Sequence, residues 1–406
     1  FLPNKWPAYY SKAKGCYVWD LEGNKYTDMS IMGIGTNILG YGHPEIDNAV
    51  RNTISEGNMS TLNCPEEVYL AEKLIEINKW ADMVRFARSG GEANAIAIRI
   101  ARAATGIDEV AICGYHGWHD WYLATNLEST SRLEEHLLPG LKPNGVPKVL
   151  SGTVHPFSYN NLNQLENIIK NNKIGAVKME VERSEPPVDG FLEGVRKLCD
   201  DNNIILIFDE CTSGFRETYG GLHKKYNIEP DMAMFGKALG NGYAITAIIG
   251  RREIMEAAQT SFISSTFWTE RIGPTAALKT LDIMHELKSW EIITKKGLEI
   301  KRNWLKLANK YGLQINIGGL SALPNFSFKS KNNNEYKTLI SQEMLKNNFL
   351  AANSVYVCTE HNQSVIDSYF VCLEDIFSLI AECEQGKPIK EYLNNESCHK
   401  GFERLN

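Results

Sequence analysis

The sequence predicts an α/β fold with a mostly parallel central sheet, helices on both faces of that sheet, and a smaller C-terminal α+β domain. The first observation is that short apolar runs alternate with amphipathic stretches between about residues 81 and 250. Strands that alternate with helices favour a largely parallel sheet covered on both faces. The second is a change of pattern beyond residue 312, where strands and helices mix. With 406 residues the chain is long enough for two or three domains.

Hydrophobic periodicity and turn residues predict the individual elements. Residues 15–28 are expected to form a hairpin with Gly23 and Asn24 at its turn, and residues 44–58 and 65–78 are expected to form helices. Six apolar runs are expected to be strands: Met83–Ala87, Val110–Gly114, Ala176–Glu180, Ile204–Asp209, Met232–Phe235 and Ala244–Gly250. Helices are expected among them at 92–104, 161–172 and 190–202, and long helices at 270–311.

Composition and charge disfavour several classes of function. The net charge is −6 and the pI about 5.9, so no basic footprint indicates nucleic-acid binding. No apolar run approaches the ~18 residues of a membrane span, and residues 1–24 do not resemble a secretory signal. The nine cysteines are odd in number and widely spaced, without a CxxC pair. Reduced thiols and a cytoplasmic location are therefore expected.

The residues that follow the strands carry the candidate chemistry, because ligands of open α/β sheets bind beyond the carboxyl ends of the strands. Residues 88–94 read RSGGEAN and precede a helix. Small residues at a helix N-terminus leave backbone N–H groups free, which is typical of a phosphate cradle. The alternative is a glycine-rich turn that only caps the helix.

Two charged residues at strand ends suggest a nitrogen partner and a Schiff base. Asp209 ends an unbroken apolar strand, where a buried carboxylate needs a partner such as a protonated nitrogen or a metal. Lys237 lies between an apolar strand and a glycine-rich turn, where desolvation would lower its pKa and favour a Schiff base. The alternatives are a surface aspartate at a strand exit and an exposed turn lysine.

The aromatic segment after the second strand run completes the set. Tyr115 could stack on a flat ring. His116 and His119 lack a third ligand, so packing or hydrogen bonding is expected for them and no metal site is predicted. A phosphate cradle, a stacking tyrosine, an aspartate and a lysine together are complementary to pyridoxal phosphate.

Longer motifs along nearly the whole chain resemble the class III aminotransferases, and among them most closely glutamate-1-semialdehyde aminomutase and its relatives. The most specific are LIFDECTSGFRETYGG and PDMAMFGKALGNGYAITAIIG. Further segments occur in the family's order: GCYVWDLEGNKYTD, ILGYGHP, ARSGGEANAIAIRIAR and YHG. LPGLKPNGVP falls where the aminomutases carry a mobile gating loop, and SSTFWTERIGPTAAL falls at the family's threonine segment.

The resemblance implies the fold type I architecture of pyridoxal-phosphate-dependent transferases, in a homodimer whose subunits share each active site. It implies an N-terminal segment at 1–48 that packs with the small domain, a large cofactor-binding domain at 49–290 and a small C-terminal domain at 291–406. Lys237 would be the Schiff-base lysine and proton shuttle, Asp209 the partner of the pyridinium nitrogen and Tyr115 the residue stacked on the ring. The implied cofactor contacts are Ser89, Gly90, Gly91, Tyr115, His116, Glu180, Asp209, Cys211, Lys237 and, from the neighbouring subunit, Thr266.

Several positions depart from the family's pattern. Gly91 replaces a threonine, so a hydroxyl contact to phosphate is lost, and Arg88 replaces an asparagine beside the cradle. We expect Arg88 to contact the phosphate or an anionic group of the substrate, with an ion pair to Glu92 as the alternative. Beyond Arg302 the only arginine is Arg404, so the usual carboxylate-binding arginine of 2-oxoglutarate-using members has no evident counterpart in the small domain.

The function implied is an aminotransferase or aminomutase acting on a small-molecule amine or carbonyl substrate, without nucleic acid or membrane partners. It would move an amino group between an amine and a carbonyl through a Schiff base on Lys237 and pyridoxamine phosphate. Transfer within one molecule and transfer to an external keto acid are both open. A decarboxylase or racemase on the same fold is the alternative. A non-catalytic binding protein is disfavoured because Lys237 and Asp209 are both retained.

Overall fold

The computed structural model describes residues 2, 5–129, 132, 141–182, 184–394 and 396–398. The chain divides into two compact units. The small unit comprises residues 1–44 and 284–406, and the large unit comprises residues 45–283. The sequence placed the corresponding boundaries at 48 and 290. The chain passes from the large unit into the small one within α10 (Ile272–Leu287).

The large unit is built on a seven-stranded sheet in the order β4-β10-β9-β8-β7-β5-β6. Strand β10 is antiparallel to both of its neighbours, whereas β6, β5, β7, β8 and β9 pair in parallel. Strand β4 therefore runs in the same direction as the parallel group. The strands span Met83–Ala87 (β4), Glu109–Cys113 (β5), Val154–Pro156 (β6), Ile174–Met179 (β7), Ile205–Glu210 (β8), Met232–Phe235 (β9) and Thr246–Gly250 (β10). This confirms the mostly parallel sheet.

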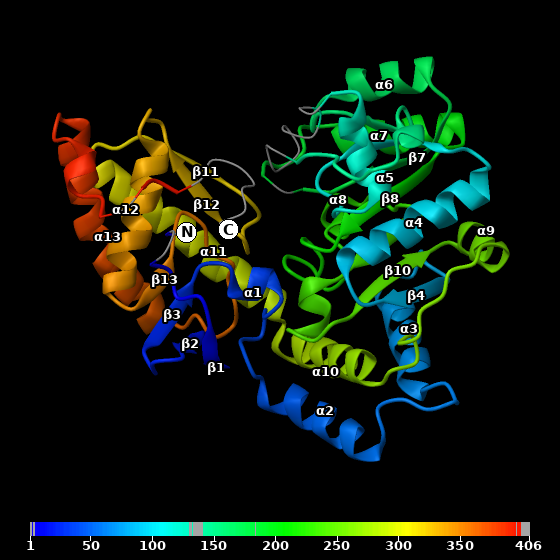
Figure 1. The fold of residues 1–406 in the computed structure, drawn as a ribbon, viewed down its shortest axis with the longest axis horizontal. Coiled ribbons are helices and arrows are strands. Elements are labelled where there is room, and N and C mark those ends of the chain that lie inside the picture. The colour runs from blue at the N-terminus through cyan, green and yellow to red at the C-terminus, as the bar shows by residue number, and fades with distance from the viewer. Residues whose placement is uncertain are drawn as a thin grey trace. The chain divides into compact units, whose positions relative to one another are not determined.

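Helices flank this sheet, and α4 shows how the sequence specifies one of them (Figure 1). Helix α4 (Gly90–Thr105) begins at Ser89, whose hydroxyl accepts a hydrogen bond from the backbone N–H of Glu92. Its buried side chains recur at helical spacing and pack onto the sheet core: Ala93, Ile96, Ala97, Ile100 and Ala101. The other helices of the large unit include α2 (Pro44–Glu56), α3 (Pro65–Ile77), α5 (Asp120–Leu123), α6 (Leu162–Asn171), α7 (Phe191–Asn202), α8 (His223–Tyr226) and α9 (Arg252–Met255).

The small unit combines a four-stranded sheet, a two-stranded sheet and three long helices. The first sheet has the order β1-β2-β3-β13, with bounds Tyr10–Lys14, Tyr17–Asp20, Lys25–Met29 and Phe349–Ala351. Strands β2 and β3 form the expected hairpin, and β13 pairs in parallel with β3 although more than 300 residues separate them. The remaining elements are α1 (Met32–Gly35), α11 (Ser289–Lys310), β11 (Ile315–Gly318), β12 (Asn325–Phe328), α12 (Asn333–Lys346) and α13 (Gln363–Glu384).

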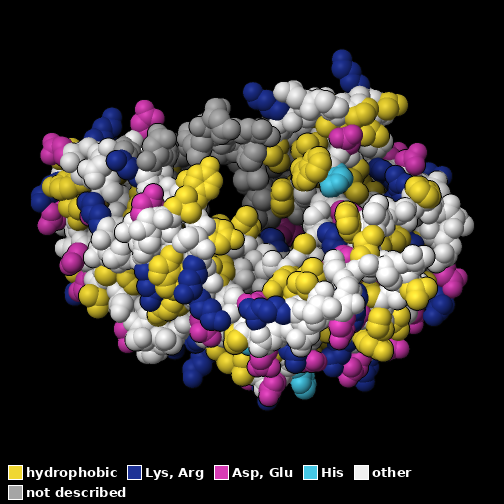
Figure 2. All heavy atoms as spheres, turned by 60° about the horizontal axis from the view of Figure 1, so that its bottom comes forward, with side chains coloured by type: hydrophobic (Ala, Val, Ile, Leu, Met, Phe, Trp, Pro, Cys, Tyr) yellow, Lys and Arg dark blue, Asp and Glu magenta, His cyan; other side chains and the backbone are white. Residues whose placement is uncertain are grey.

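The exposed surface carries charges of both signs. Figure 2 shows Lys, Arg, Asp and Glu side chains interspersed over one face, with smaller hydrophobic areas between them. None of the helices in the described ranges is long and apolar enough to cross a bilayer.

Candidate active site

Candidate functional residues follow the strands at one edge of the large unit's sheet. Because β4, β5, β7, β8 and β9 run in the same direction, their carboxyl ends meet at that edge. The residues there are Ser89, Gly90 and Gly91 after β4, Tyr115 and His116 after β5, and Glu180 after β7; Asp209 and Cys211 lie at the end of β8, and Lys237 follows β9. The structure thus brings together nine of the ten site residues expected from the sequence.

Asp209 is a buried acidic group at this edge with two basic neighbours. Its side chain is 4% exposed. The Oδ2 atom lies 2.9 Å from Nδ1 of His116 and 3.8 Å from Nζ of Lys178, while Oδ1 accepts a hydrogen bond from the backbone N–H of Cys211 at 3.2 Å. Burial alone raises the pKa of Asp209, but the Lys178 ammonium and the His116 hydrogen bond outweigh it and hold that pKa below its usual range. Asp209 is therefore an ionised carboxylate at neutral pH.

His116 is a buried hydrogen-bonding residue, as the sequence indicated. Burial lowers the pKa of His116 despite its contact with Asp209. A neutral ring that donates from Nδ1 to the Asp209 carboxylate fits this environment. Its ring stacks on Trp121 with centroids 6.4 Å apart, and its Nε2 atom is buried without a hydrogen-bond partner among the described residues. An unpartnered buried nitrogen beside this carboxylate is compatible with a ligand at the same edge.

Lys237 occupies a constrained turn directly after β9. Its φ is 41°, a left-handed conformation that L-residues adopt at a cost of about 1 kcal/mol. The Nζ atom donates a hydrogen bond to Oγ1 of Thr212 at 2.8 Å, and Thr212 comes three residues after Asp209. The side chain of Cys211, at the end of β8, lies close to the end of β9. Its Sγ atom is 3.3 Å from the position that a Cβ on Gly236 would take. Burial raises the pKa of the Cys211 thiol, which is therefore neutral.

The glycine segment at the start of α4 is closely covered by the loop that follows β5. A Cβ on Gly91 would lie 2.7 Å from Cε1 and Nδ1 of His119 and 3.4 Å from Nε1 of Trp118. The family's threonine at this position would therefore collide with His119. The first-turn N–H groups of α4 and the positive end of its dipole lie at the same edge as Asp209 and Lys237.

Glu180 holds the loop that carries Tyr115. Its Oε2 accepts a hydrogen bond from the backbone N–H of Tyr115 at 3.1 Å. Gly114 before it has φ 116°, and a Cβ there would be 2.6 Å from the same oxygen, so only glycine allows this close approach. The Tyr115 ring packs edge-on against Tyr122, with centroids 6.0 Å apart. The Glu180 carboxylate thus holds Tyr115 in position by binding the backbone N–H of Tyr115.

Arg88 makes contacts within the protein that the sequence did not predict. Its Nε pairs with Oε1 of Glu270 at 3.0 Å, and one terminal nitrogen donates to the carbonyls of Phe267 and Trp268 at 2.6 and 3.1 Å. Glu92 accepts from the backbone N–H of Arg88 and forms no ion pair with its guanidinium. The expected ion pair with Glu92 is therefore wrong, whereas a contact of Arg88 with the phosphate or with an anionic group of the substrate stays a prediction. Arg88 instead fastens the segment that carries Thr266, whose side chain is exposed.

Two residues of the site were missed from the sequence. Thr212 is the hydrogen-bond acceptor for Lys237, and a threonine in a turn gives no signal of that role. Lys178 is fully buried in β7, and a lysine inside the apolar run Ala176–Glu180 was the available signal. The segment expected to correspond to a gating loop, residues 138–147, lies outside the described residues at 138–140.

The residues at this edge fit pyridoxal phosphate. A buried ionised carboxylate, Asp209, suits a protonated ring nitrogen, and a lysine, Lys237, suits an aldehyde. The N-terminus of α4 suits a phosphate group. Because His119 and Trp118 leave no room for a side chain at Gly91, backbone N–H groups would make the contact there.

Comparisons with known proteins agree with this geometry. The family model "Aminotransferase class-III" matches residues 3–375. A 3-aminobutyryl-CoA aminotransferase of Cloacimonas acidaminovorans is 32% identical over 89% of this chain and 86% of its own length. A glutamate-1-semialdehyde 2,1-aminomutase of Syntrophobacter fumaroxidans is also 32% identical, over 84% of this chain and 82% of its own length.

Solved structures show the same fold. The FumI protein of Sphingopyxis sp. MTA144, solved with PLP, superposes with a TM-score of 0.85 at 23% identity, covering 97% of this chain and 94% of that one. An omega-transaminase of Sphaerobacter thermophilus gives a TM-score of 0.82 at 21% identity, over 95% and 93% of the two chains. With a family match across most of its length and relatives at 32% identity, the chain belongs to the class III aminotransferases, pyridoxal-phosphate enzymes of fold type I.

Proposed function

We propose that this protein transfers an amino group between a small-molecule amine and a carbonyl compound, with Lys237 as the residue that forms the Schiff base and moves the proton. The observation that carries the proposal is the presence of one lysine and one ionised buried carboxylate at the ends of neighbouring strands. Lys237 Nζ is held at 2.8 Å from Thr212 Oγ1, three residues after Asp209. A lysine fixed in this way can reach an aldehyde on one side and the substrate carbon on the other.

The remaining residues have supporting roles in this proposal. When bound, pyridoxal phosphate supplies an aldehyde that accepts the amino group and a conjugated ring that takes up electrons. Asp209 stabilises positive charge on a ring nitrogen, and Thr212 holds Lys237 Nζ between proton transfers. Tyr115 and Cys211 would cover the two faces of the cofactor's flat ring. The first-turn N–H groups of α4 bind a phosphate group, with Ser89, Gly90 and Gly91 forming the bend.

Product analysis with limiting enzyme tests amino transfer. Incubated with a suitable amine and no keto acid, the holoenzyme should release one equivalent of the derived carbonyl compound per site and then stop. Adding a keto acid should restore turnover, and Lys237→Ala should abolish both phases. Release of CO2, or inversion of the amine's stereocentre without any carbonyl product, would contradict amino transfer and support the decarboxylase or racemase alternative.

A glutamate-1-semialdehyde aminomutase-like reaction is the second candidate. It is favoured by the Syntrophobacter fumaroxidans relative and by the resemblance of residues 138–147 to a gating loop. Here a substrate carrying both an amino and an aldehyde group would be isomerised over many turnovers with no keto acid added. A single equivalent of product without an acceptor would exclude this candidate and leave the intermolecular reaction.

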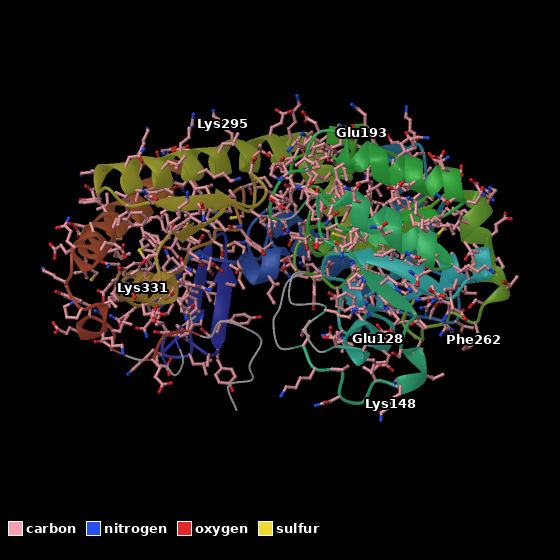
Figure 3. The ribbon with its side chains drawn as sticks, turned by 90° about the horizontal axis from the view of Figure 1, so that it is seen from above. Glu128, Lys148, Glu193, Phe262, Lys295 and Lys331 are labelled. Atoms are coloured by element: carbon pink, nitrogen blue, oxygen red, sulfur yellow. The ribbon has the colours of Figure 1, made fainter. Side chains whose placement is uncertain are left out.

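We propose a homodimer that shares its active sites. In the large unit, Arg271 connects residues 58–69 with its own segment, residues 262–271. Its guanidinium pairs with Glu66 at 2.6 Å, and its backbone N–H donates to the carbonyl of Asn58. Large hydrophobic side chains are exposed in both segments: Met59, Leu62, Val68, Tyr69, Phe262 and Phe267. Phe262 is 87% exposed and lies at the periphery of the ribbon (Figure 3). Large apolar side chains exposed in this way are typical of a subunit interface.

Mixed subunits test the sharing of sites. Chains with Lys237→Ala and chains with Thr266→Ala, mixed and refolded together, should regain activity at low cofactor concentration, because one site of the hybrid is then intact. An active monomer at high dilution would contradict the shared site.

A cytoplasmic location is proposed as well, supported by nine free cysteines. Recovery of the native protein in an oxidising extracellular fraction would contradict it.

A further inference from the structure

A fully buried lysine in the central sheet is not used by the proposed function. Lys178 lies in β7 with its side chain 0% exposed, and the other residues of that strand are apolar, from Ile174 to Met179. A buried ammonium group is costly unless it has a charged or hydrogen-bonding partner. The partner of Lys178 therefore indicates what the residue does.

The partner is the carboxylate of Asp209. The Lys178 Nζ atom lies 3.8 Å from Asp209 Oδ2 and donates to the thioether sulfur of Met234 at 3.2 Å. Among the described residues that sulfur, a weak acceptor, is its one hydrogen-bond partner. Asp209 and Met234 are register partners on β8 and β9, and Lys178 pairs with Ile207 on the neighbouring strand. The lysine is thus built into the sheet beside the carboxylate.

The two oxygens of Asp209 are occupied unequally. Oδ2 faces both His116 and Lys178, whereas Oδ1 accepts the backbone N–H of Cys211. Lys178 is the basic group that faces Oδ2 from inside the sheet, at 3.8 Å. Burial lowers the pKa of the Lys178 ammonium, while the Asp209 carboxylate beside it favours the charged form. His116 and the Cys211 thiol do not compete for this role, because burial keeps both of them neutral. A carboxylate already balanced by one cation attracts a second one less strongly.

We propose that Lys178 is a positioning residue that weakens the hold of Asp209 on a protonated ring nitrogen. A carboxylate that already interacts with the Lys178 ammonium would interact less strongly with a protonated ring nitrogen. The ring nitrogen then gives up its proton more readily, which limits how strongly the cofactor withdraws electrons. This goes beyond amino transfer as such, since it holds whatever amine the enzyme uses.

Cofactor binding to the full chain, stripped of its cofactor, tests this without measuring turnover. The ratio of dissociation constants for 1-deazapyridoxal phosphate, which lacks the ring nitrogen, and pyridoxal phosphate reports how much the site favours that nitrogen. Lys178→Met should raise this ratio about tenfold or more, as removal of a charge this close shifts a partner's pKa by about one to three units. Lys224→Met, which removes a lysine bound to backbone carbonyls elsewhere in the large unit, should leave the ratio at the wild-type value. A ratio within about twofold of wild type for Lys178→Met, or a lower one, would overturn the proposal.

A double variant shows whether the effect passes through Asp209. In an Asp209→Asn chain, Lys178→Met should no longer change the ratio. A tenfold change in that background would overturn the role assigned to Lys178.

If Lys178→Met does not fold, the unaltered chain loaded with ring-15N cofactor gives the answer. Its nitrogen signal should move from the protonated toward the unprotonated position between about pH 7 and 10, while a signal that stays protonated contradicts the proposal. The charged or titratable groups facing this cluster are Asp209, His116, Glu180, Cys211 and Lys237. Because only binding and protonation are measured, failure here would leave the amino-transfer proposal intact.

Discussion

Replacing Arg88 by alanine is expected to destabilise the large unit without removing a cofactor contact. The guanidinium group pairs with Glu270 and donates to the carbonyls of Phe267 and Trp268. It therefore joins the end of β4 to the segment before α10. Each hydrogen bond from a charged group contributes about 1.5–3 kcal/mol, so the two hydrogen bonds to the Phe267 and Trp268 carbonyls together contribute roughly 3–6 kcal/mol.

The lower end of that range is expected. The Arg88 and Glu270 side chains are 18% and 11% exposed, so solvent screens the pair in part. Glu270 also keeps two partners after the substitution, because its carboxylate accepts the backbone N–H groups of Ile272 and Gly273, each at 3.0 Å. A loss of about 3 kcal/mol corresponds to a fall in Tm of about 6–12 °C for a unit of this size.

Thermal unfolding of the cofactor-free chain measures this effect directly. Arg99→Ala is the matched control, because Arg99 donates one exposed hydrogen bond to the Phe262 carbonyl of the same segment. Its Tm should fall by no more than about 3 °C, since one exposed hydrogen bond contributes about 1 kcal/mol or less. An unchanged Tm for Arg88→Ala, together with at least a tenfold weaker cofactor affinity, would refute this reasoning and restore a direct phosphate contact.

Four further outcomes are expected. Lys237→Ala should abolish amino transfer and the borohydride-reducible link to the cofactor, as seen by mass spectrometry; a reducible link that persists in the variant would contradict the assignment. Asp209→Asn should retain cofactor but lose more than about 100-fold in kcat, by removing about 3 kcal/mol of charge stabilisation; near-normal kcat would oppose it. Thr212→Val should lower kcat about fivefold by releasing Lys237 Nζ, for the loss of about 1 kcal/mol, with cofactor content unchanged. Burial lowers the pKa of His361 to about 4, and its Nδ1 accepts the Cys358 N–H. Since the unfolded histidine takes up a proton below about pH 6.5, stability should fall by roughly 2 kcal/mol from pH 7 to pH 4.5. In urea titrations His361→Asn should flatten that dependence, and a wild-type stability that does not change would contradict it.

The sequence predicted the large unit well because its signals are local. Apolar runs fix the strands, and the rule that ligands bind at carboxyl ends places Asp209 and Lys237 together without any knowledge of distances. Strand β6, three residues long, is too short to show a period. The pairing of β13 with β3 joins segments more than 300 residues apart, which no local pattern encodes.

Side-chain partners were harder to predict than positions. Arg88 was correctly located beside the glycine segment, but its partners belong to residues about 180 positions later in the chain. Lys178 is recognisable in the sequence as a charged residue within an apolar strand. Its role, however, depends on the oxygen of Asp209 that its ammonium group faces. Such pairings depend on the register between strands, and periodicity does not specify it.

The reversed direction of β10 has a consequence for the order in which the protein folds. Strands β9 and β10 pair as a local hairpin, so the turn that carries Lys237 closes with little loop entropy. On its other side β10 pairs with β4, and Thr246 bonds the Ser89 carbonyl across a sequence separation of 157 residues. The glycine segment at the start of α4 therefore gains its neighbouring strand only after residue 250 has been synthesised. We expect a nascent chain that ends before β10 to form the Asp209 strand pairs but not to retain the cofactor.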